Sequence, residues 1–262
     1  MDPALRAAAS GMMAQQTRTE VIANNLANVN TTGFKRGRAN FEDLLYQTVQ
    51  GASVVGQPEN QTQPAIQVGR GTRLVGVTRL HSQGALETTN RPLDVAIEGE
   101  GFFQVQLPNG QTEYTRDGTL QISDQGVLVT SEGHAIVPNI KIPSDATNVA
   151  IGATGIVSVT RGQSTTPEEL GRIELARFAN PAGLEAQGQN LYAATPASGD
   201  AVTGFPQDDG FGRTVQGAVE SSNVEIVQEM VDMISAMRAY EINSKAIKNS
   251  EDMLEIANNL VK

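Results

Sequence analysis

Long helical patterns of apolar residues occupy the two ends of this chain and constrain its fold more than any other feature. The first pattern begins at Asp2, which can cap a helix, and Pro3, whose missing N–H would be unpaired in the first turn anyway. Apolar residues then recur every three or four positions from Leu5 to Val29, and Gly33 ends the pattern. The sequence therefore predicts a helix over residues 1–30.

The C-terminal pattern is longer. Ser222 and Glu225 have the spacing of a capping box, and residues 218–262 contain neither glycine nor proline. A run of roughly 40 residues gives a helix of about 60 Å, which is longer than most helices of globular proteins. Its apolar positions follow a heptad-like repeat. We therefore predict one helical domain from residues 1–30 and 222–262, with its two helices paired in a coiled-coil-like manner.

The apolar surface of the second helix is wider than pairing with one other helix requires. Val227, Val231 and Ile234 lie outside the heptad-like repeat. A helix pair within one chain is the simpler interpretation, but it leaves these residues without neighbours. We therefore predict that the helices also contact other copies of the chain. The residues expected to carry helix packing and polymerisation are Leu5, Met12, Ile22, Leu26, Met230, Met233, Met237, Tyr240, Ile247 and Leu254.

The middle of the chain consists of short β-type runs separated by turn residues. Pairs such as Asn109-Gly110 and Asp117-Gly118 favour hairpins, because both residues tolerate positive φ. We predict an antiparallel β-domain over residues 73–215 and a return linker over 216–221, and hence an α+β fold. The predicted strands are 74–80, 94–97, 102–107, 113–115, 119–122, 127–129, 135–137, 156–160 and 173–178.

A connecting segment over residues 31–72 lies between the first helix and the β-domain. From Gln47 to Gln67 its composition is dominated by Gln, Gly, Ser, Thr and Pro, which is typical of a flexible loop. The stretch is too long for an ordinary connection. It is interpreted either as plain disorder or as a loop that becomes ordered only in an assembly.

Composition argues against several functional classes. The net charge is −10, which disfavours nucleic-acid binding, and the absence of cysteine excludes thiol chemistry and disulfides. The two histidines, His81 and His134, show no metalloprotease spacing, and Asp208-Asp209 is interpreted as solvated surface charge. We predict no catalytic residue, no cofactor and no metal site. Residues 1–30 lack the pattern of a cleaved signal peptide, and no apolar run is long enough to insert into a membrane.

Five sequence blocks strongly resemble the family of bacterial flagellar rod and hook proteins. They are residues 24–35 (NNLANVNTTGFK), 91–103 (RPLDVAIEGEGFF), 114–118 (YTRDG), 222–225 (SNVE) and 238–241 (RAYE). The blocks occur in the family's order and span the chain. The length, and the segment 41–48 (FEDLLYQT) with the polar stretch after it, are similar to subunits of the distal rod.

The resemblance implies that the terminal helices pair antiparallel in one coiled-coil-like domain. It also implies a structural subunit that polymerises into a rigid hollow drive shaft, carrying torque from motor to hook and passing exported subunits through its channel. It implies export without a cleaved signal and a location in the basal body, where the rod spans the periplasm. The implied partners are further copies of the chain, proximal rod proteins, the hook protein, the outer-membrane and peptidoglycan ring bushing, the rod cap and the type III export apparatus. The alternatives are a proximal rod or hook-type protein, and an enzyme that acts on the cell wall.

The resemblance also suggests roles for two sets of residues. The rod-type insertion, about residues 47–71, is expected to stiffen the rod through Tyr46, Val54, Val55, Ile66 and Val68. Polar residues of the C-terminal helix are expected to line the channel, where they would not hold an unfolded passenger. The candidates are Asn243, Lys245, Asn249, Asn258 and Asn259.

Overall fold

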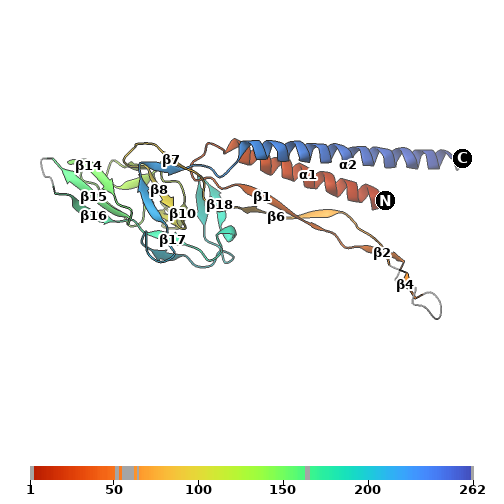
Figure 1. Ribbon diagram of the computed structural model, residues 1–262, viewed down its shortest axis with the longest axis horizontal. Helices are drawn as coiled ribbons and strands as arrows, with labels where there is room; N and C mark the ends of the chain where they lie inside the picture. The colour runs from red at the N-terminus through yellow and green to blue at the C-terminus, as the bar shows by residue number, and fades with distance from the viewer. Residues whose placement is uncertain (1–2, 51–52, 55–61, 64, 163–165, 261–262) are drawn as a thin grey trace. The chain divides into compact units, whose positions relative to one another are not determined.

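The chain has an α+β fold with two helices and an antiparallel β-rich region. The computed structural model describes residues 3–50, 53–54, 62–63, 65–162 and 166–260. It divides into two compact units (Figure 1). Residues 1–26, 37–78 and 226–262 form the helical unit, and residues 27–36 and 79–225 form the β-rich unit. Among the described residues, no helix is both long enough and apolar enough to cross a membrane.

The helical unit contains helices α1 (Pro3–Ala27) and α2 (Ile226–Leu260), which lie side by side (Figure 1). Their contacts run in antiparallel order. Asn25 of α1 bonds to Glu229 near the start of α2, at 3.2 Å, and Arg18 pairs with Asp232 at 3.1 Å. Both predicted helices are thus confirmed, and Asp2 lies outside the described residues.

The predicted capping box is wrong. Helix α2 begins at Ile226, and residues 222–225 are not helical. The Ser222 hydroxyl has no hydrogen-bond partner among the described residues, and Asn223 uses its side chain to bind backbone groups of the β-rich unit instead. These tertiary hydrogen bonds hold the segment extended, which overrides the local helix signal.

A long two-stranded arm completes the helical unit. Strand β1 (Gly37–Asp43) pairs with β6 (Thr72–Arg79), and the arm continues through β2 (Gln47–Gln50) with β5 (Ile66–Val68) and β3 (Ser53–Val54) with β4 (Thr62–Gln63) (Figure 1). We call residues 37–78, in their described parts, the arm. The sequence predicted a flexible loop over much of this region, but Thr, Val and Gln form a paired ladder there, in which Gln47 faces Val68.

The arm is attached to α1 at two places. Asn25 exchanges two hydrogen bonds with the backbone of Gly37, at 2.8 and 2.9 Å. Farther toward the start of α1, the Ser10 hydroxyl accepts a hydrogen bond from the Thr72 amide at 3.2 Å. Gly71 has a φ of +109° there, and a Cβ at this position would lie 2.1 Å from the Ser10 oxygen, so the close approach requires glycine.

The β-rich unit is built on one large antiparallel sheet with smaller ladders beside it. The large sheet has the strand order β11-β12-β13-β9-β10-β19-β18, and β17 pairs with both β9 and β20. Strands β14, β15 and β16 form a second sheet, while β21 pairs with β8 and β22 with β7. A 3-10 helix η1 spans Pro181–Gly183. The strands are β7 (Leu86–Thr88), β8 (Val95–Glu98), β9 (Phe102–Gln106), β10 (Thr112–Thr115), β11 (Leu120–Ile122), β12 (Leu128–Thr130), β13 (Ala135–Ile136), β14 (Ala146–Ile151), β15 (Ile156–Arg161), β16 (Glu168–Arg172), β17 (Leu175–Arg177), β18 (Glu185–Gly188), β19 (Leu191–Ala193), β20 (Val202–Gly204), β21 (Arg213–Gln216) and β22 (Ala218–Glu220).

The core of the β-rich unit is apolar and fully enclosed. Phe103, Val105, Leu120 and Leu175 belong to a cluster of buried side chains from both the large sheet and the smaller one. Each such residue stabilises the fold by about 1.5–3 kcal/mol relative to leaving it exposed. Every strand predicted within this unit is confirmed in place. The strands that were not predicted include exposed ones such as β18, where polar residues give no apolar alternation to read.

Candidate assembly surfaces

The seam between α1 and α2 consists of small and polar residues. On α2, Glu229, Ala236, Asn243 and Ser250 follow one another at intervals of seven residues, and the first, second and fourth are buried. Asn243 lies against Gly11 of α1, where an added Cβ would come within 2.9 Å of its amide nitrogen. Ala236, Asn243 and Ser250 are short, and a glycine lies opposite Asn243, so the two helices can approach closely there.

Asn25 is the polar centre of this seam. The residue is buried, and its Nδ2 donates both to Glu229 Oε2 on α2 and to the carbonyl oxygen of Gly37 on the arm. Its Oδ1 accepts a hydrogen bond from the Gly37 amide. One side chain therefore connects α1, α2 and the arm.

The predicted period of seven residues is present on α2. The buried residues with this period that face α1 lie one position before the predicted Met230 and Met237. Met230 and Met237 directly follow the buried Glu229 and Ala236, and a shift of one residue rotates the helix face by about 100°. Among the predicted packing residues, Ile22 is buried and Leu5, Met12, Leu26, Met233 and Ile247 are partly buried. Met230, Met237, Tyr240 and Leu254 are exposed in this chain, and their burial between copies stays a prediction.

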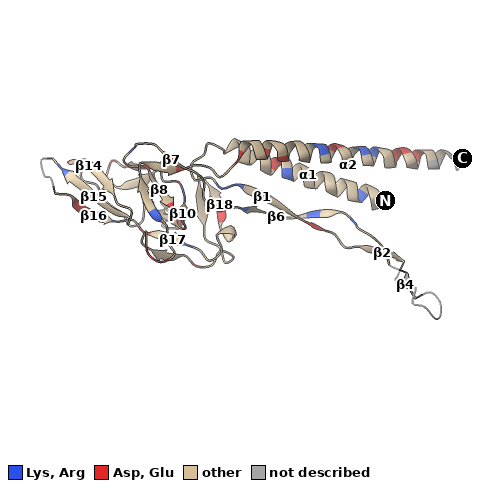
Figure 2. Ribbon diagram, in the orientation of Figure 1, with Lys and Arg blue, Asp and Glu red and all other residues tan. Residues whose placement is uncertain are grey.

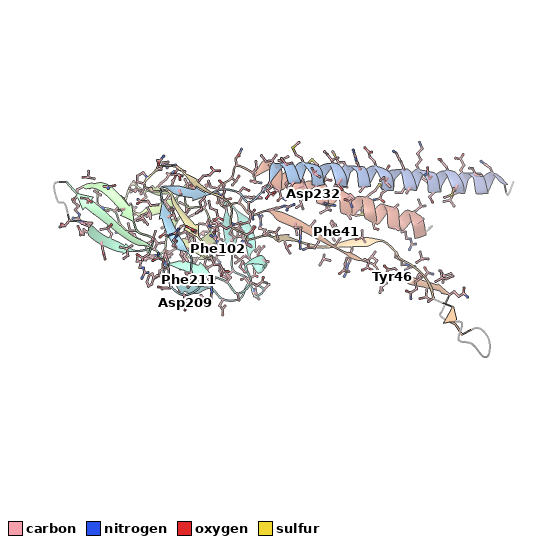
Figure 3. The ribbon with its side chains drawn as sticks, viewed as in Figure 1. Phe41, Tyr46, Phe102, Asp209, Phe211 and Asp232 are labelled. Atoms are coloured by element: carbon pink, nitrogen blue, oxygen red, sulfur yellow. The ribbon has the colours of Figure 1, made fainter. Side chains whose placement is uncertain are left out.

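The outer surface of α2 is unusually apolar for an isolated chain. Side chains project from α2 on the side away from α1 (Figure 3). Val227 is 76% exposed, and further large apolar residues are exposed along the rest of the helix: Val231, Ile234, Ile242, Met253, Leu254 and Ile256. Large apolar side chains exposed along one helix in this way mark a protein–protein contact.

A groove of about 400 Å³ runs along one side of the helix pair. Met237 and Tyr240 contribute apolar surface from α2, and Glu20 and Glu241 bring a carboxylate from each helix. Gln16 and Thr19 of α1 complete its lining.

The arm carries a second group of exposed apolar residues. Leu45, Val49, Ile66 and Val68 are exposed, and Tyr46 is exposed beside Gly69, where an added Cβ would be 3.4 Å from its ring (Figure 3). Of the other predicted stiffening residues, Val54 lies in β3 with its side chain undescribed, and Val55 lies outside the described residues.

The predicted channel-lining residues do not share one environment. Asn243 is partly buried against Gly11, whereas Lys245, Asn249 and Asn259 are exposed. The side chain of Asn258 lies outside the described part of the chain. The channel role is thus open to the three exposed residues, and it stays a prediction.

The β-rich unit contains a buried ionic cluster that sequence reasoning missed. Lys35 Nζ lies 2.6 Å from Glu220 Oε1, and both side chains are 0% exposed. Arg116 Nη1 lies 3.3 Å from Glu220 Oε2. Lys35 also donates to the carbonyl oxygen of Ser82 at 2.8 Å, and the Gly84 amide donates to Glu220 Oε1 at 2.9 Å.

The electrostatics of this cluster reflect strong burial. Burial lowers the pKa of Lys35, and Glu220 opposes that shift. Burial also lowers the pKa of Arg116. The pKa of His81 falls to about 4, first because the ring is buried and then because Lys35 and Arg116 are nearby, so His81 is neutral at pH 7. With the Lys35 and Glu220 side chains fully enclosed, the cluster organises the fold and offers no reactive surface.

The cluster joins segments that are far apart in the sequence. The Gly33 amide donates to the backbone oxygen of Glu220 at 2.7 Å, and Asn223 Oδ1 accepts a hydrogen bond from the Arg36 amide at 2.7 Å. Asn223 Nδ2 donates to the Leu80 carbonyl oxygen at 2.8 Å. The segments around residues 33–36, 80–84 and 220–223 are thus tied together within the β-rich unit. Gly33 and Asn223 both lie in sequence blocks that carried the family resemblance. Those blocks were the feature of the sequence that could have indicated these residues.

Comparison with known proteins agrees with this architecture. Family models described as "Flagella basal body rod protein", "Flagellar hook protein FlgE/F/G D1 domain" and "Flagellar basal body rod FlgEFG protein C-terminal" match residues 5–35, 96–159 and 215–260. Three proteins named flagellar basal-body rod protein FlgG align along nearly their whole length. The relative from Borreliella burgdorferi is 52% identical and that from Caulobacter vibrioides 46%, each over 98% of both chains, and that from Bacillus subtilis is 39% identical over 96% of both.

The chain belongs to the family of flagellar basal-body rod proteins. It is a structural component of the flagellum, located in the basal body where the rod spans the periplasm, and it is not an enzyme. The alternative of a cell-wall enzyme is therefore wrong.

The ionic cluster yields a stability prediction with a matched control. Replacing Glu220 by leucine (Glu220→Leu) leaves Lys35 and Arg116 buried without their carboxylate, and we expect a loss of about 3–5 kcal/mol in unfolding free energy. Glu98→Leu removes a carboxylate from an exposed ion pair with Arg213, at 2.8 Å, and should cost less than about 1 kcal/mol. Chemical denaturation measures both. Equal losses for the two variants would contradict the structural role of the cluster.

Proposed function

We propose that this chain polymerises into the distal rod as a rigid, hollow drive shaft that transmits torque from motor to hook and passes exported subunits through its channel. The observation that carries this proposal is the distribution of side chains on α2. Glu229, Ala236 and Ser250 are buried on the side that faces α1, whereas many of the large apolar residues of α2 are exposed. A chain that folded to act alone would gain stability from the reverse arrangement.

The energetics favour assembly over an isolated helical unit. Helices with little tertiary burial are only marginally stable, and binding to further copies stabilises the folded form by mass action. The intervals of seven residues on α2 support an antiparallel coiled-coil-like pair as the repeating element. Contacts between different faces of identical copies do not close on themselves, and therefore build a helical tube.

Several partners follow from the same proposal. Proximal rod proteins and the hook protein would continue the tube at its two ends, and the rod cap and type III export apparatus would deliver and place subunits. The β-rich unit would meet the outer-membrane and peptidoglycan ring bushing. Asn249 and Asn259 are exposed polar groups on α2 that suit a channel wall. The net charge of −10 disfavours nucleic acid as a partner.

Electron microscopy of concentrated protein tests the proposal. The full chain should form straight tubes. A chain limited to residues 27–225 retains the apolar core and the ionic cluster, so it should stay folded and monomeric. This truncation preserves Asn223, whose hydrogen bonds belong to the β-rich unit. Filaments from the truncated chain, or no tubes from the full chain, would contradict the assignment of polymerisation to the helices.

We further propose that the arm sets the stiffness of the rod. Apolar residues of the arm, among them Tyr46, Val49 and Ile66, are exposed because the chain itself does not cover them. Packed between neighbouring copies, they would fill gaps and fix the spacing of subunits. A tube without this filling would be free to bend.

Deletion of residues 47–67 tests the role of the arm. The expected polymers are tubes that still assemble through the helices but curve or flex, as judged from their persistence length in electron micrographs. A control variant of full length has Tyr46, Ile66 and Val68 all changed to serine. It keeps the length of the arm but removes apolar side chains, so it distinguishes the effect of apolar contact from the effect of arm length. If the deletion tubes are as straight as those of the parent, the arm has no stiffening role and rigidity resides in the helices.

A further inference from the structure

Two faces of the helix pair are complementary in shape and charge. The first is the groove of about 400 Å³ beside α1 and α2. Met237 and Tyr240 are 47% and 43% exposed along it, although both are large and mainly apolar. Glu20 and Glu241 add two carboxylates to its lining. The groove is therefore an apolar surface with an acidic margin.

The second face is a ridge on the outer side of α2, next to the groove. Ile234, Arg238 and Ile242 follow each other at intervals of four residues, and Lys245 comes three residues later. At about 100° per residue, Ile234 and Arg238 point roughly 160° away from Ala236, which is buried toward α1. Ile234 is 50% exposed and Ile242 is 66% exposed. The ridge is thus an apolar row with basic residues, directed away from the rest of the helix pair.

The charged side chains of the groove and the ridge form no ion pairs within the described part of the chain. Among the described residues, neither Glu20 nor Glu241 has an ion-pair partner, and the same holds for Arg238 and Lys245. Figure 2 shows both basic and acidic residues along α2. Glu241 lies three residues after Arg238 and four before Lys245 on the same helix, whereas Glu20 lies on α1. A second copy that brings its basic ridge to the groove would therefore meet the opposite charge of Glu20.

We propose that the groove of one copy receives the α2 ridge of a second copy, with Arg238 and Lys245 approaching the carboxylates of Glu20 and Glu241. This inference rests on the proposed polymerisation and names the contact that drives it. A ridge of residues spaced by four packs into a groove between helices, as in ordinary helix packing. Because groove and ridge are different faces, each copy that receives a ridge still presents its own ridge to the next copy, and the contact repeats side by side around a tube.

Charge exchange between the two faces tests the contact. Glu20→Lys with Glu241→Lys makes the groove basic, and Arg238→Glu with Lys245→Glu makes the ridge acidic. Each double variant alone should raise the critical concentration for tube formation at least about tenfold, because like charges then meet at the contact. An equal mixture of the two should restore tubes, because each variant's groove then meets a ridge of opposite charge. The chain that carries all four changes should assemble alone for the same reason.

A matched control changes the same charge elsewhere. Asp124→Lys with Glu132→Lys reverses two exposed carboxylates of the β-rich unit, and its tubes should match those of the parent. If the groove and ridge variants assemble like this control, or if mixing them restores nothing, the inference is overturned while the proposed function stands. Failure of the parent chain to form tubes would instead count against the proposed function.

Cross-linking in assembled basal bodies gives a second, independent readout. The chain has no cysteine, so Glu20→Cys with Arg238→Cys introduces one on each face. Since Arg238 points away from α1, a disulfide within one chain is excluded by geometry. Oxidation of isolated basal bodies should give a ladder of reducible multimers, whereas each single cysteine variant should give dimers at most. The absence of a ladder overturns the inference, whatever the purified protein does in solution.

Discussion

The hydrogen bonds of Asn25 are the constraint on which the helical unit depends. This buried amide joins Glu229 of α2 and both backbone groups of Gly37 on the arm. A buried amide is stable only when its donors and acceptor are paired, so it fixes the helix pair and the arm in one arrangement. Small and polar residues occupy much of the seam, while Val227, Val231, Ile234 and Ile242 of α2 are exposed, where further copies can cover them.

The β-rich unit reaches its stability by a different route. Its apolar core includes Phe103 and Leu175, both fully buried, and its ionic cluster ties early and late segments of the chain around Glu220. The unit contains what it needs to fold by itself. The β-rich unit has its own core, whereas the helical unit leaves apolar side chains exposed. Such a subunit is suited to polymerisation, because contacts between copies can bury the helical side chains while the β-rich unit stays as it is.

The sequence predicts those features of the fold that depend on local periodicity. The helices, the family and most strands of the large sheet followed from patterns in the chain, but β18, β19 and β20 of that sheet did not. The face of α2 that meets α1 did not, because hydrophobicity alone favours Met230 and Met237, whereas close approach of two helices selects Ala236 and Asn243 beside Gly11. Met230 and Met237 of the predicted set therefore lie one position after the buried Glu229 and Ala236, whereas Met233 and Ile247 are partly buried.

Long-range polar contacts were beyond sequence reasoning. Lys35 and Glu220 are separated by 185 positions, and neither has a local pattern that marks it as buried. The capping-box spacing of Ser222 and Glu225 was misleading, because Asn223 between them is held by the distant Arg36 and Leu80 backbones. The strands of the arm were missed because Gln and Thr residues are typical of loops, and only the pairing of β2 with β5 makes them a ladder.

The central claim is that the helical unit is marginal in a single chain and becomes stable through contacts between copies. Hydrogen exchange followed by mass spectrometry tests it most directly, with the monomer and the assembled tube compared under the same conditions. The account predicts that amides of α2 exchange orders of magnitude faster than those of β9 in the monomer, and that both are protected in the tube. Equal, strong protection of α2 and β9 in the monomer would contradict it.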